Sequence, residues 1–240
     1  ETNFVLFRAH SGDIRLPELR LLGSPVELSD TAKCLGITFC KSLKWTAHFE
    51  SIRAKCYSVI SSLRRLRSAG IPLAARLTVY RSLFLPVLCY CVSIWGGGSG
   101  TIAGRCQILQ NDSLRALPGR RRSESVSDLY AAYGLLDFRQ LHFLHIAVLA
   151  HRSHVGNIPA DVSFPLDAIV PLRSSRRPTS FHLPLAHLEV VARSLACRLP
   201  RVWGSLPQDL RRLGSTKIFA TKLSYCYCGI CQRFVTLGIQ

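Results

Sequence analysis

Residues 45–68 read WTAHFESIRAKCYSVISSLRRLRS and carry the clearest structural pattern in the chain. Apolar residues recur there at spacings of three and four, which is the period of an α-helix with one apolar face. These residues are Phe49, Ile52, Cys56, Val59, Ile60, Leu63 and Leu66. We expect Thr46 to cap the start of this helix, and Gly70 followed by Pro72 to end it.

The opposite face of the same helix is basic. It carries Arg53, Lys55, Arg64, Arg65 and Arg67. A second basic run, RALPGRRR at residues 115–122, adds Arg115, Arg120, Arg121 and Arg122. Arginine presents a planar fork of donors that matches phosphate oxygens, so both runs are candidate surfaces for a nucleic-acid backbone.

The charge of the whole chain favours the same function. Its 240 residues have a formal net charge of +17, and 25 of the 31 basic residues are Arg. Residues 1–45 have a net charge of only +1, whereas residues 46–240 have +16. A surface that follows phosphates explains this asymmetry, and a solvated face on an ordinary protein is the alternative. With 48% hydrophobic residues, the chain is too apolar to be a disordered basic tail.

A second helix is expected from Pro72 to about Trp95, with a kink at Pro86. No charged residue occurs from Ser82 to Gly104. The GGGSG run at 96–100 interrupts this segment, leaving about 14 apolar residues where a membrane span needs about 20. We therefore expect a buried core helix with a hinge at the glycine run, and no membrane segment.

The remaining sequence predicts further helices and a long loop. The expected helices are 101–117, 125–133, 138–155, 188–199, 207–213 and 216–225. Ser125 and Asp128 are expected to cap the second of them. Beyond Gly156, repeated prolines predict an irregular segment before the last helices.

Short strands are expected before the first helix. The segments with strand patterns are 3–9, 13–22 and 32–40, with a turn at residues 11–13. In the last of them Leu35, Ile37 and Phe39 alternate around Gly36. This part of the chain predicts a small antiparallel sheet.

No complete catalytic site is visible in the sequence. Enzymes that act on phosphodiesters hold two metal ions with clustered carboxylates. Asp13, Glu18, Glu27 and Asp30 lie near one another in sequence, but no two of them are adjacent. We expect them in structural loops, and we expect no catalytic or metal-binding residue in this chain.

The cysteines and histidines leave one question open. Cys226, Cys228 and Cys231 form a C-x-C-x2-C pattern, for which Cys197 with His182 or His187 could supply a further zinc ligand. Reduced, unliganded thiols are the default expectation. His142, His145, His151 and His154 occur in two pairs at one-turn spacing and are expected on a helix surface.

Several motifs follow one another in an order that resembles a known family. They are TNFVLF at 2–7, KCLGITF at 33–39, LKWTAHF at 43–49, YRSLFLPVLCYC at 80–91 with Ile94-Trp95-Gly96, QILQNDSLR at 107–115, Asp128-Leu129-Tyr130, and WGSLP at 203–207 with Phe219 after it. In this order they resemble the C-terminal part of the reverse transcriptase of non-LTR, LINE-type (jockey-like) retrotransposons. The similarity extends over most of the chain.

The resemblance implies a parent RNA-directed DNA polymerase that uses Mg²⁺, with palm, fingers and endonuclease domains upstream of this chain. The chain would then be a fragment, which its lack of Met also favours. Glu1 stands where the family usually has Lys, and no Asp-Asp pair like the family's catalytic one occurs. The strand with Lys33, Leu35 and Gly36 matches the primer grip, which holds the primer's 3′ end.

Together these observations predict an α+β fold that is mostly α. Residues 1–45 would be the end of the palm with a primer-grip-like strand, residues 46–156 a helical thumb, and residues 157–240 a basic C-terminal segment. The expected function is to hold RNA and DNA, as the primer–template hybrid, without catalysis or a cofactor of its own. The alternatives are a non-enzymatic basic module that binds nucleic acid or protein, and a decayed remnant. The sequence does not decide where the protein acts in the cell. If functional, it would act within a ribonucleoprotein in the nucleus or the cytoplasm.

Overall fold

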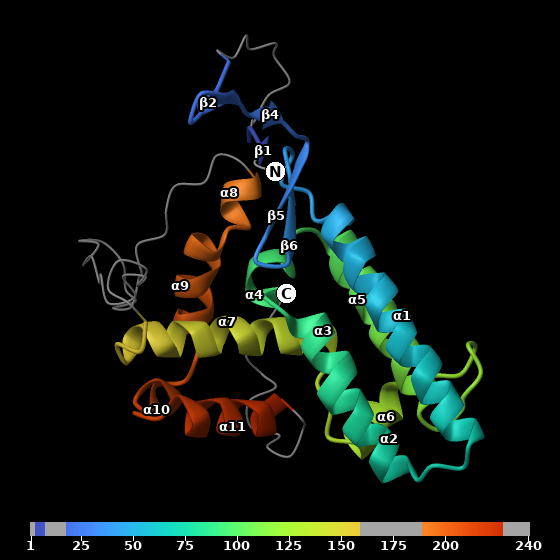
Figure 1. The fold of residues 1–240 in the computed structure, drawn as a ribbon. Coiled ribbons are helices and arrows are strands. Elements are labelled where there is room, and N and C mark those ends of the chain that lie inside the picture. The colour runs from blue at the N-terminus through green and yellow to red at the C-terminus, as the bar shows by residue number, and fades with distance from the viewer. Residues whose placement is uncertain (1–2, 8–17, 159–188, 228–240) are drawn as a thin grey trace.

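Helix α1 (Thr46–Ser68) runs along one side of the molecule and lies lengthwise against α5 (Gly100–Ala116), as Figure 1 shows. In this computed structural model, which describes residues 3–7, 18–158 and 189–227, α1 buries most of the predicted apolar stripe. Val59 and Leu66 are only half-buried. The predicted cap is wrong, because Trp45 occupies the N-cap position and no side chain caps the helix.

The segment expected as one kinked helix is divided into several pieces: α2 (Leu73–Val79), the π-helix η1 (Tyr80–Phe84), α3 (Leu85–Cys89) and α4 (Val92–Trp95). The N–H of Leu85 bonds the carbonyl of Tyr80, so the wide π turn lies immediately before Pro86. Such a turn accommodates a residue that has no N–H to donate. The helical segment is interrupted after Cys89 and not at Pro86, and Cys91 there has a φ of 49°.

The next helices agree with their predicted ranges. They are α5, α6 (Ser127–Ala132) and α7 (Phe138–His154). The predicted capping pair of α6 is wrong, because no side chain caps that helix and Asp128 binds Arg120 instead. Helix α7 begins with a capping box, in which Asp137 and Gln140 each accept the other's backbone N–H.

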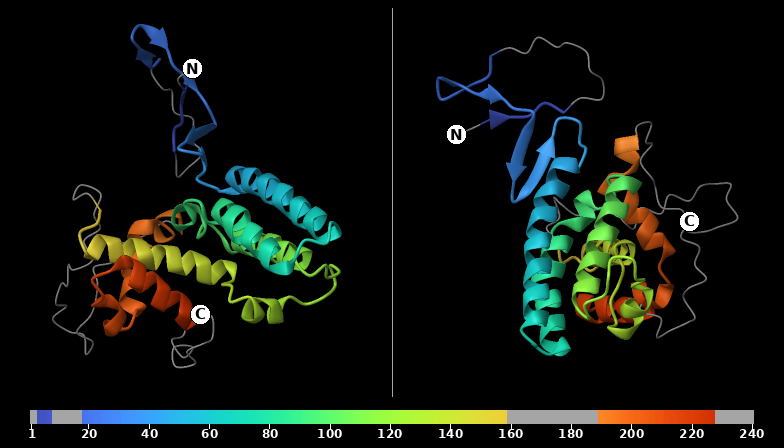
Figure 2. Two further views of the ribbon diagram at one scale, coloured as in Figure 1. Left: turned by 60° about the horizontal axis from the view of Figure 1, so that its bottom comes forward. Right: turned by 90° about the vertical axis from the view of Figure 1, so that its right-hand side faces the viewer.

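The described C-terminal part consists of α8 (Glu189–Ala192), α9 (Leu195–Ser205), α10 (Gln208–Arg211) and α11 (Thr216–Tyr227). The helix expected over 188–199 is therefore two helices, and the second extends to Ser205. Figure 2 (left) shows the red helix α11 on one side of α7 and the green helices of the first part of the chain on the other side.

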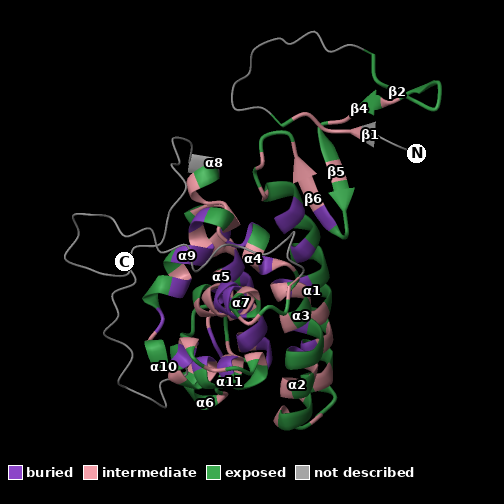
Figure 3. Cartoon of the chain, turned by 90° about the vertical axis from the view of Figure 1, so that its left-hand side faces the viewer, coloured by how far each residue is buried: buried purple, intermediate pink, exposed green. Residues whose placement is uncertain are grey.

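Within the described ranges, two hydrophobic clusters form the core. The first joins α1 to α6 around the buried rings of Tyr80, Phe84 and Trp95, and the second joins α7 to α9, α10 and α11 around Trp203 and Phe219. Helix α7 contributes its first residue to one cluster and its middle to the other. The buried positions, purple in Figure 3, lie where these helices face one another.

The strands form short pairs. Strand β1 (Asn3–Phe4) pairs in parallel with β4 (Glu27–Leu28), while β2 (Arg20–Leu21) with β3 (Ser24–Pro25) and β5 (Thr31–Cys34) with β6 (Ile37–Cys40) are antiparallel hairpins. The single strand expected over 32–40 is wrong, because Leu35 and Gly36 form a two-residue turn inside it. The expected turn at 11–13 lies outside the described residues.

These elements confirm an α+β fold that is mostly α. Of the helices in the described ranges, none is both long and apolar enough to cross a bilayer. The three-part division at residues 45/46 and 156/157 stays a prediction.

Candidate nucleic-acid interface

Two basic segments that are far apart in sequence meet around one hollow of about 350 Å³. Five residues predicted to bind phosphate line it: Arg64, Arg67, Arg115, Arg120 and Arg122. They meet because α1 packs along α5, and the loop that follows α5 turns back beside the C-terminal half of α1. Gly119 in this loop has a φ of 90°, and a Cβ there would overlap the Arg67 guanidinium.

The five arginines differ in how far carboxylates neutralise them. Arg120 donates to both carboxylate oxygens of Asp128, at 2.6 and 2.5 Å, and this hydrogen bond lowers the pKa of Asp128. Arg115 pairs with Asp112 at 3.1 Å. Arg64, Arg67 and Arg122 form no ion pair with any residue that the structure describes. These three therefore give the hollow most of its uncompensated positive charge.

The other predicted residues of these two runs lie outside the hollow. Arg53 pairs with Glu50 at 2.8 Å, and Glu50 also binds Arg105. Lys55, Arg65 and Arg121 are exposed. Arg53 is therefore partly neutralised, whereas the exposed side chains remain accessible.

The residues that match the primer grip form a separate group. Lys33 is exposed on β5, and Leu35 is 85% exposed in the turn, where its carbonyl accepts a hydrogen bond of 2.7 Å from the Tyr90 hydroxyl. Gly36 lies against the ring of Tyr90. The hairpin contacts the first turn of α1 through Thr38, whose N–H donates to His48.

The structure therefore does not bring all the predicted residues together. A helix rises 1.5 Å per residue, so His48 and Arg67 lie about 28 Å apart along α1. The primer-grip-like turn and the arginine hollow lie near opposite ends of this helix.

A further set of arginines, missed from the sequence, has a structural role. Arg198 on α9 donates to the carbonyl of Ser93 at 2.9 Å and to Nε2 of His142 at 2.5 Å, and Arg193 donates to the carbonyl of Gly98. No local pattern marks these residues, because their partners come from α4, α7 and the glycine run. Part of the basic excess is thus used inside the fold.

The glycine run has a packing role, while the expected hinge stays a prediction. A Cβ on Gly97 would overlap the Arg198 guanidinium, and one on Gly98 would overlap the Trp45 ring. The absence of side chains lets α9 and the start of α1 approach this segment closely. That is a sufficient physical reason for three consecutive glycines here.

Two of the histidines expected on a helix surface, His142 and His151, instead pack against neighbouring parts of the fold. Burial and the neighbouring Arg198 lower the pKa of His142 to about 3. His151 is fully buried, with Nδ1 3.1 Å from the Thr216 hydroxyl and Nε2 2.6 Å from the Leu213 carbonyl. Both face neighbouring helices, since α7 is covered on more than one side.

The described ranges contain no group of three or more His, Cys, Asp or Glu that could hold a metal ion. Glu18 and Asp30 form ion pairs with Arg20 and Lys41. Most of the candidate zinc ligands lie outside the described residues, namely Cys228, Cys231, His182 and His187.

The fold and this hollow define a basic helical bundle that follows short strand pairs, and sequence comparison places it among known proteins. The chain is 33% identical over 101 residues to a probable RNA-directed DNA polymerase from transposon BS of Drosophila melanogaster, an alignment that covers 41% of this chain and 11% of that protein. It is 29% identical over 97 residues to a retrovirus-related Pol polyprotein from type-1 retrotransposable element R1 of Bradysia coprophila, covering 40% and 10%. The related R1 4 polyprotein of Nasonia vitripennis is 29% identical over 86 residues, covering 35% and 22%.

These matches confirm the resemblance inferred from the motifs: the chain is a sequence relative of non-LTR retrotransposon reverse transcriptases. The matched part spans only 10% to 22% of the length of these relatives. No protein-family model and no solved structure matches the chain.

Proposed function

We propose that this chain binds the backbone of an RNA–DNA primer–template hybrid, as the thumb-containing part of a retrotransposon polymerase. The observation that carries the proposal is the convergence of Arg64, Arg67 and Arg122 around one hollow, without carboxylate partners among the described residues. Guanidinium groups bind phosphate oxygens through paired, charge-assisted hydrogen bonds. Contacts to phosphates do not depend on base sequence, which suits a polymerase that copies any template.

The other predicted residues extend this surface. The exposed side chains of Lys55, Arg65 and Arg121 would follow the same backbone beyond the hollow. Lys33, Leu35 and Gly36 would contact the primer end at the other end of α1. In this proposal residues 1–45, 46–156 and 157–240 act as palm end, thumb and C-terminal segment.

The proposal gives the chain no catalytic step of its own. No two aspartates are adjacent in the sequence. Asp112, which lines the hollow, and Asp128, which binds Arg120, are both held by arginines. These residues do not fit a site for catalytic Mg²⁺. Metal chemistry would belong to the palm of the whole polymerase. The upstream palm, fingers and endonuclease domains would be the partners of this chain.

The salt dependence of hybrid binding tests the proposal. We expect the logarithm of the binding constant to fall linearly with the logarithm of salt concentration. The triple variant R64Q/R67Q/R122Q should reduce this slope by about 1 for each lost phosphate contact. The readout is fluorescence anisotropy of a labelled RNA–DNA hybrid over a KCl series.

A matched control removes the same charge elsewhere. Arg152, Arg201 and Arg212 are exposed on or beside α7, α9 and α10, so R152Q/R201Q/R212Q should leave the slope nearly unchanged. An equal loss in both triple variants would contradict a localised interface. A shallow slope together with a protein partner would favour the non-enzymatic module, and templated extension with dNTPs and Mg²⁺ would contradict the non-catalytic assignment.

A further inference from the structure

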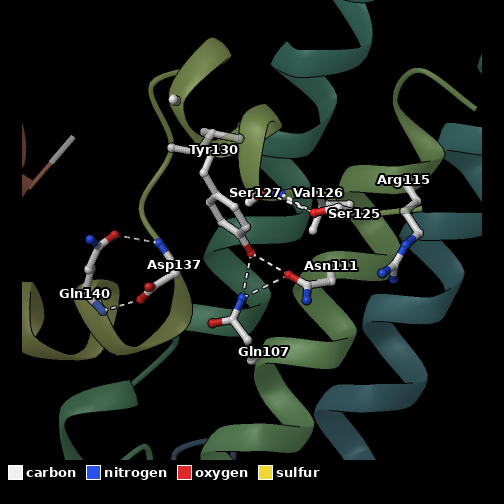
Figure 4. A pocket seen from close by; sticks show the side chains of 11 residues that line it. Gln107, Asn111, Arg115, Ser125, Val126, Ser127, Tyr130, Asp137 and Gln140 are labelled. Atoms are coloured by element: carbon white, nitrogen blue, oxygen red, sulfur yellow. Dashed lines mark hydrogen bonds between the residues drawn. The ribbon is translucent and has the colours of Figure 1, made fainter. Parts of the chain in front are cut away.

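A second pocket, of about 540 Å³, lies on the other side of α5 from α1. Residues of α5, of α6 and the loop before it, and of the start of α7 line this open pocket, and Figure 4 shows its polar side chains. Arg115 lines both this pocket and the arginine hollow. A strand that lies on the hollow therefore passes directly beside the second pocket.

Three side chains in the pocket hold one another in place. The Tyr130 hydroxyl donates to Oδ1 of Asn111 at 2.8 Å and accepts from Nε2 of Gln107 at 2.6 Å. Nε2 of Gln107 also donates to Oδ1 of Asn111 at 3.0 Å, and Oε1 of Gln107 accepts the backbone N–H of Phe138. This network, dashed in Figure 4, fixes the Asn111 amide so that Nδ2 remains a donor without a partner in the described part of the chain.

The capping box of α7 supplies further polar groups. It uses Oδ1 of Asp137 and Oε1 of Gln140, which leaves Oδ2 of Asp137 as an acceptor and Nε2 of Gln140 as a donor. Val126, Ala131 and Leu135 form apolar parts of the wall. The pocket thus combines amide donors, a carboxylate acceptor and apolar surface.

We propose that this pocket receives an unpaired nucleobase where a strand of the hybrid continues as a single strand across the arginine hollow, an inference that rests on the proposed function. The edge of an unpaired base carries mixed donors and acceptors that amide and carboxylate groups complement. Its faces suit the ring of Tyr130 and the apolar wall. A paired base has its edge occupied, so the pocket selects single-stranded nucleic acid.

Binding of two strands with equal numbers of phosphates tests this proposal. One is a short single-stranded oligonucleotide, and the other has the same backbone with abasic sites in place of its central bases. Because one stacked base contributes 1–3 kcal/mol, we expect wild type to prefer the base-containing strand by about 10-fold. The measurement is anisotropy with the full chain, performed with RNA and with DNA.

The variant N111D is the sharpest probe. It keeps the oxygen that accepts from Tyr130 and Gln107 but replaces the free Nδ2 donor with an acceptor. Its added negative charge weakens both strands equally, so the ratio of their affinities is the readout. We expect this ratio to fall several-fold, because the base edge loses its Asn111 donor while stacking on the Tyr130 ring remains. Y130F, which removes the hydroxyl that orients Asn111, should also lower it, and circular dichroism melts show whether both variants fold.

The outcomes separate the two proposals. Equal affinity of wild type for both strands, or an unchanged preference in folded N111D and Y130F, overturns the base pocket. If hybrid binding remains salt-dependent in that case, the proposed function stands without it. Loss of salt-dependent binding to every strand overturns both.

Discussion

Arginines have two different roles in this protein. Some lie in the solvent-accessible hollow, and others donate hydrogen bonds to carbonyl groups within the fold. Arg64 and Arg67 end in a hollow open to solvent and lack carboxylate partners in the described ranges. Arg198 is enclosed by α4, α7 and α9, and donates to the carbonyl groups of Ser93 and Ile94. Its guanidinium satisfies carbonyl groups at the end of α4, where the helix itself supplies no further backbone donors.

Replacement of Arg198 should therefore destabilise the fold. We expect R198M to lose about 1–2 kcal/mol of unfolding free energy, because the part-buried Ser93 carbonyl and the His142 ring lose their charged donor. The exposed Arg201 on the same helix is the control, and R201M should change stability by less than about 0.5 kcal/mol. Urea unfolding followed by tryptophan fluorescence measures both. Equal losses in the two variants would contradict the structural role of Arg198.

The glycine run gives a second prediction about single residues. G97A should destabilise the protein by about 1–2 kcal/mol, because its Cβ would displace the Arg198 guanidinium from the Ser93 carbonyl and from His142. A Cβ on Gly100 meets no atom within 4 Å, so G100A should be neutral or slightly stabilising. Thermal melts of the two variants provide the comparison. A neutral G97A would contradict the packing role of Gly97.

Among the elements, the two hairpins share an unusual turn. Leu22-Gly23 and Leu35-Gly36 each place both residues at positive φ, from 46° to 82°. Two-residue hairpin turns need this conformation, and Asn-Gly is its usual sequence. Because Leu is not a turn residue, the alternation around Gly36 resembled a continuous strand. The turn is set by the pairing of β5 with β6 and by the contact with Tyr90.

Replacing Leu35 with Asn should stabilise the β5–β6 hairpin. Asn adopts positive φ more readily than Leu, and Leu35 is 85% exposed, so little burial is lost. We expect L35N to raise the unfolding free energy by about 1 kcal/mol. L35A, which removes the same side chain without a preference for positive φ, is the control for denaturant titrations. Stabilisation of equal size in L35A would refute the conformational explanation.

In the whole molecule, α7 joins both hydrophobic clusters, so we expect them to unfold together. A single cooperative transition would argue against a decayed, partly folded remnant.

The histidines link the unfolding transition to pH. Burial is the main cause that lowers the pKa values of His48, His142 and His151 from the ordinary value of 6.5.

Stability should therefore fall as pH drops below about 6.5. In that range the unfolded chain binds protons that the native histidines do not, so protonation favours unfolding. For His142, with a native pKa of about 3, the loss between pH 7.5 and pH 5 is roughly 2 kcal/mol. H142Q keeps an acceptor for Arg198 and should show a correspondingly weaker pH dependence in urea titrations. Identical dependence in H142Q and wild type would contradict this assignment.

Local patterns in the sequence were sufficient for the helices α1, α5, α7 and α11, for the two basic runs, and for the relationship to retrotransposon reverse transcriptases. Helical periodicity depends on neighbours three or four residues away, so the sequence displays it directly. The arrangement of α1, α5 and the loop after α5 was not readable in this way. That arrangement brings Arg64 and Arg67 to Arg122, just as the arrangement of α4, α7 and α9 brings Arg198 to His142. It depends on which helix faces bury each other, a choice made by packing among residues distant in the chain.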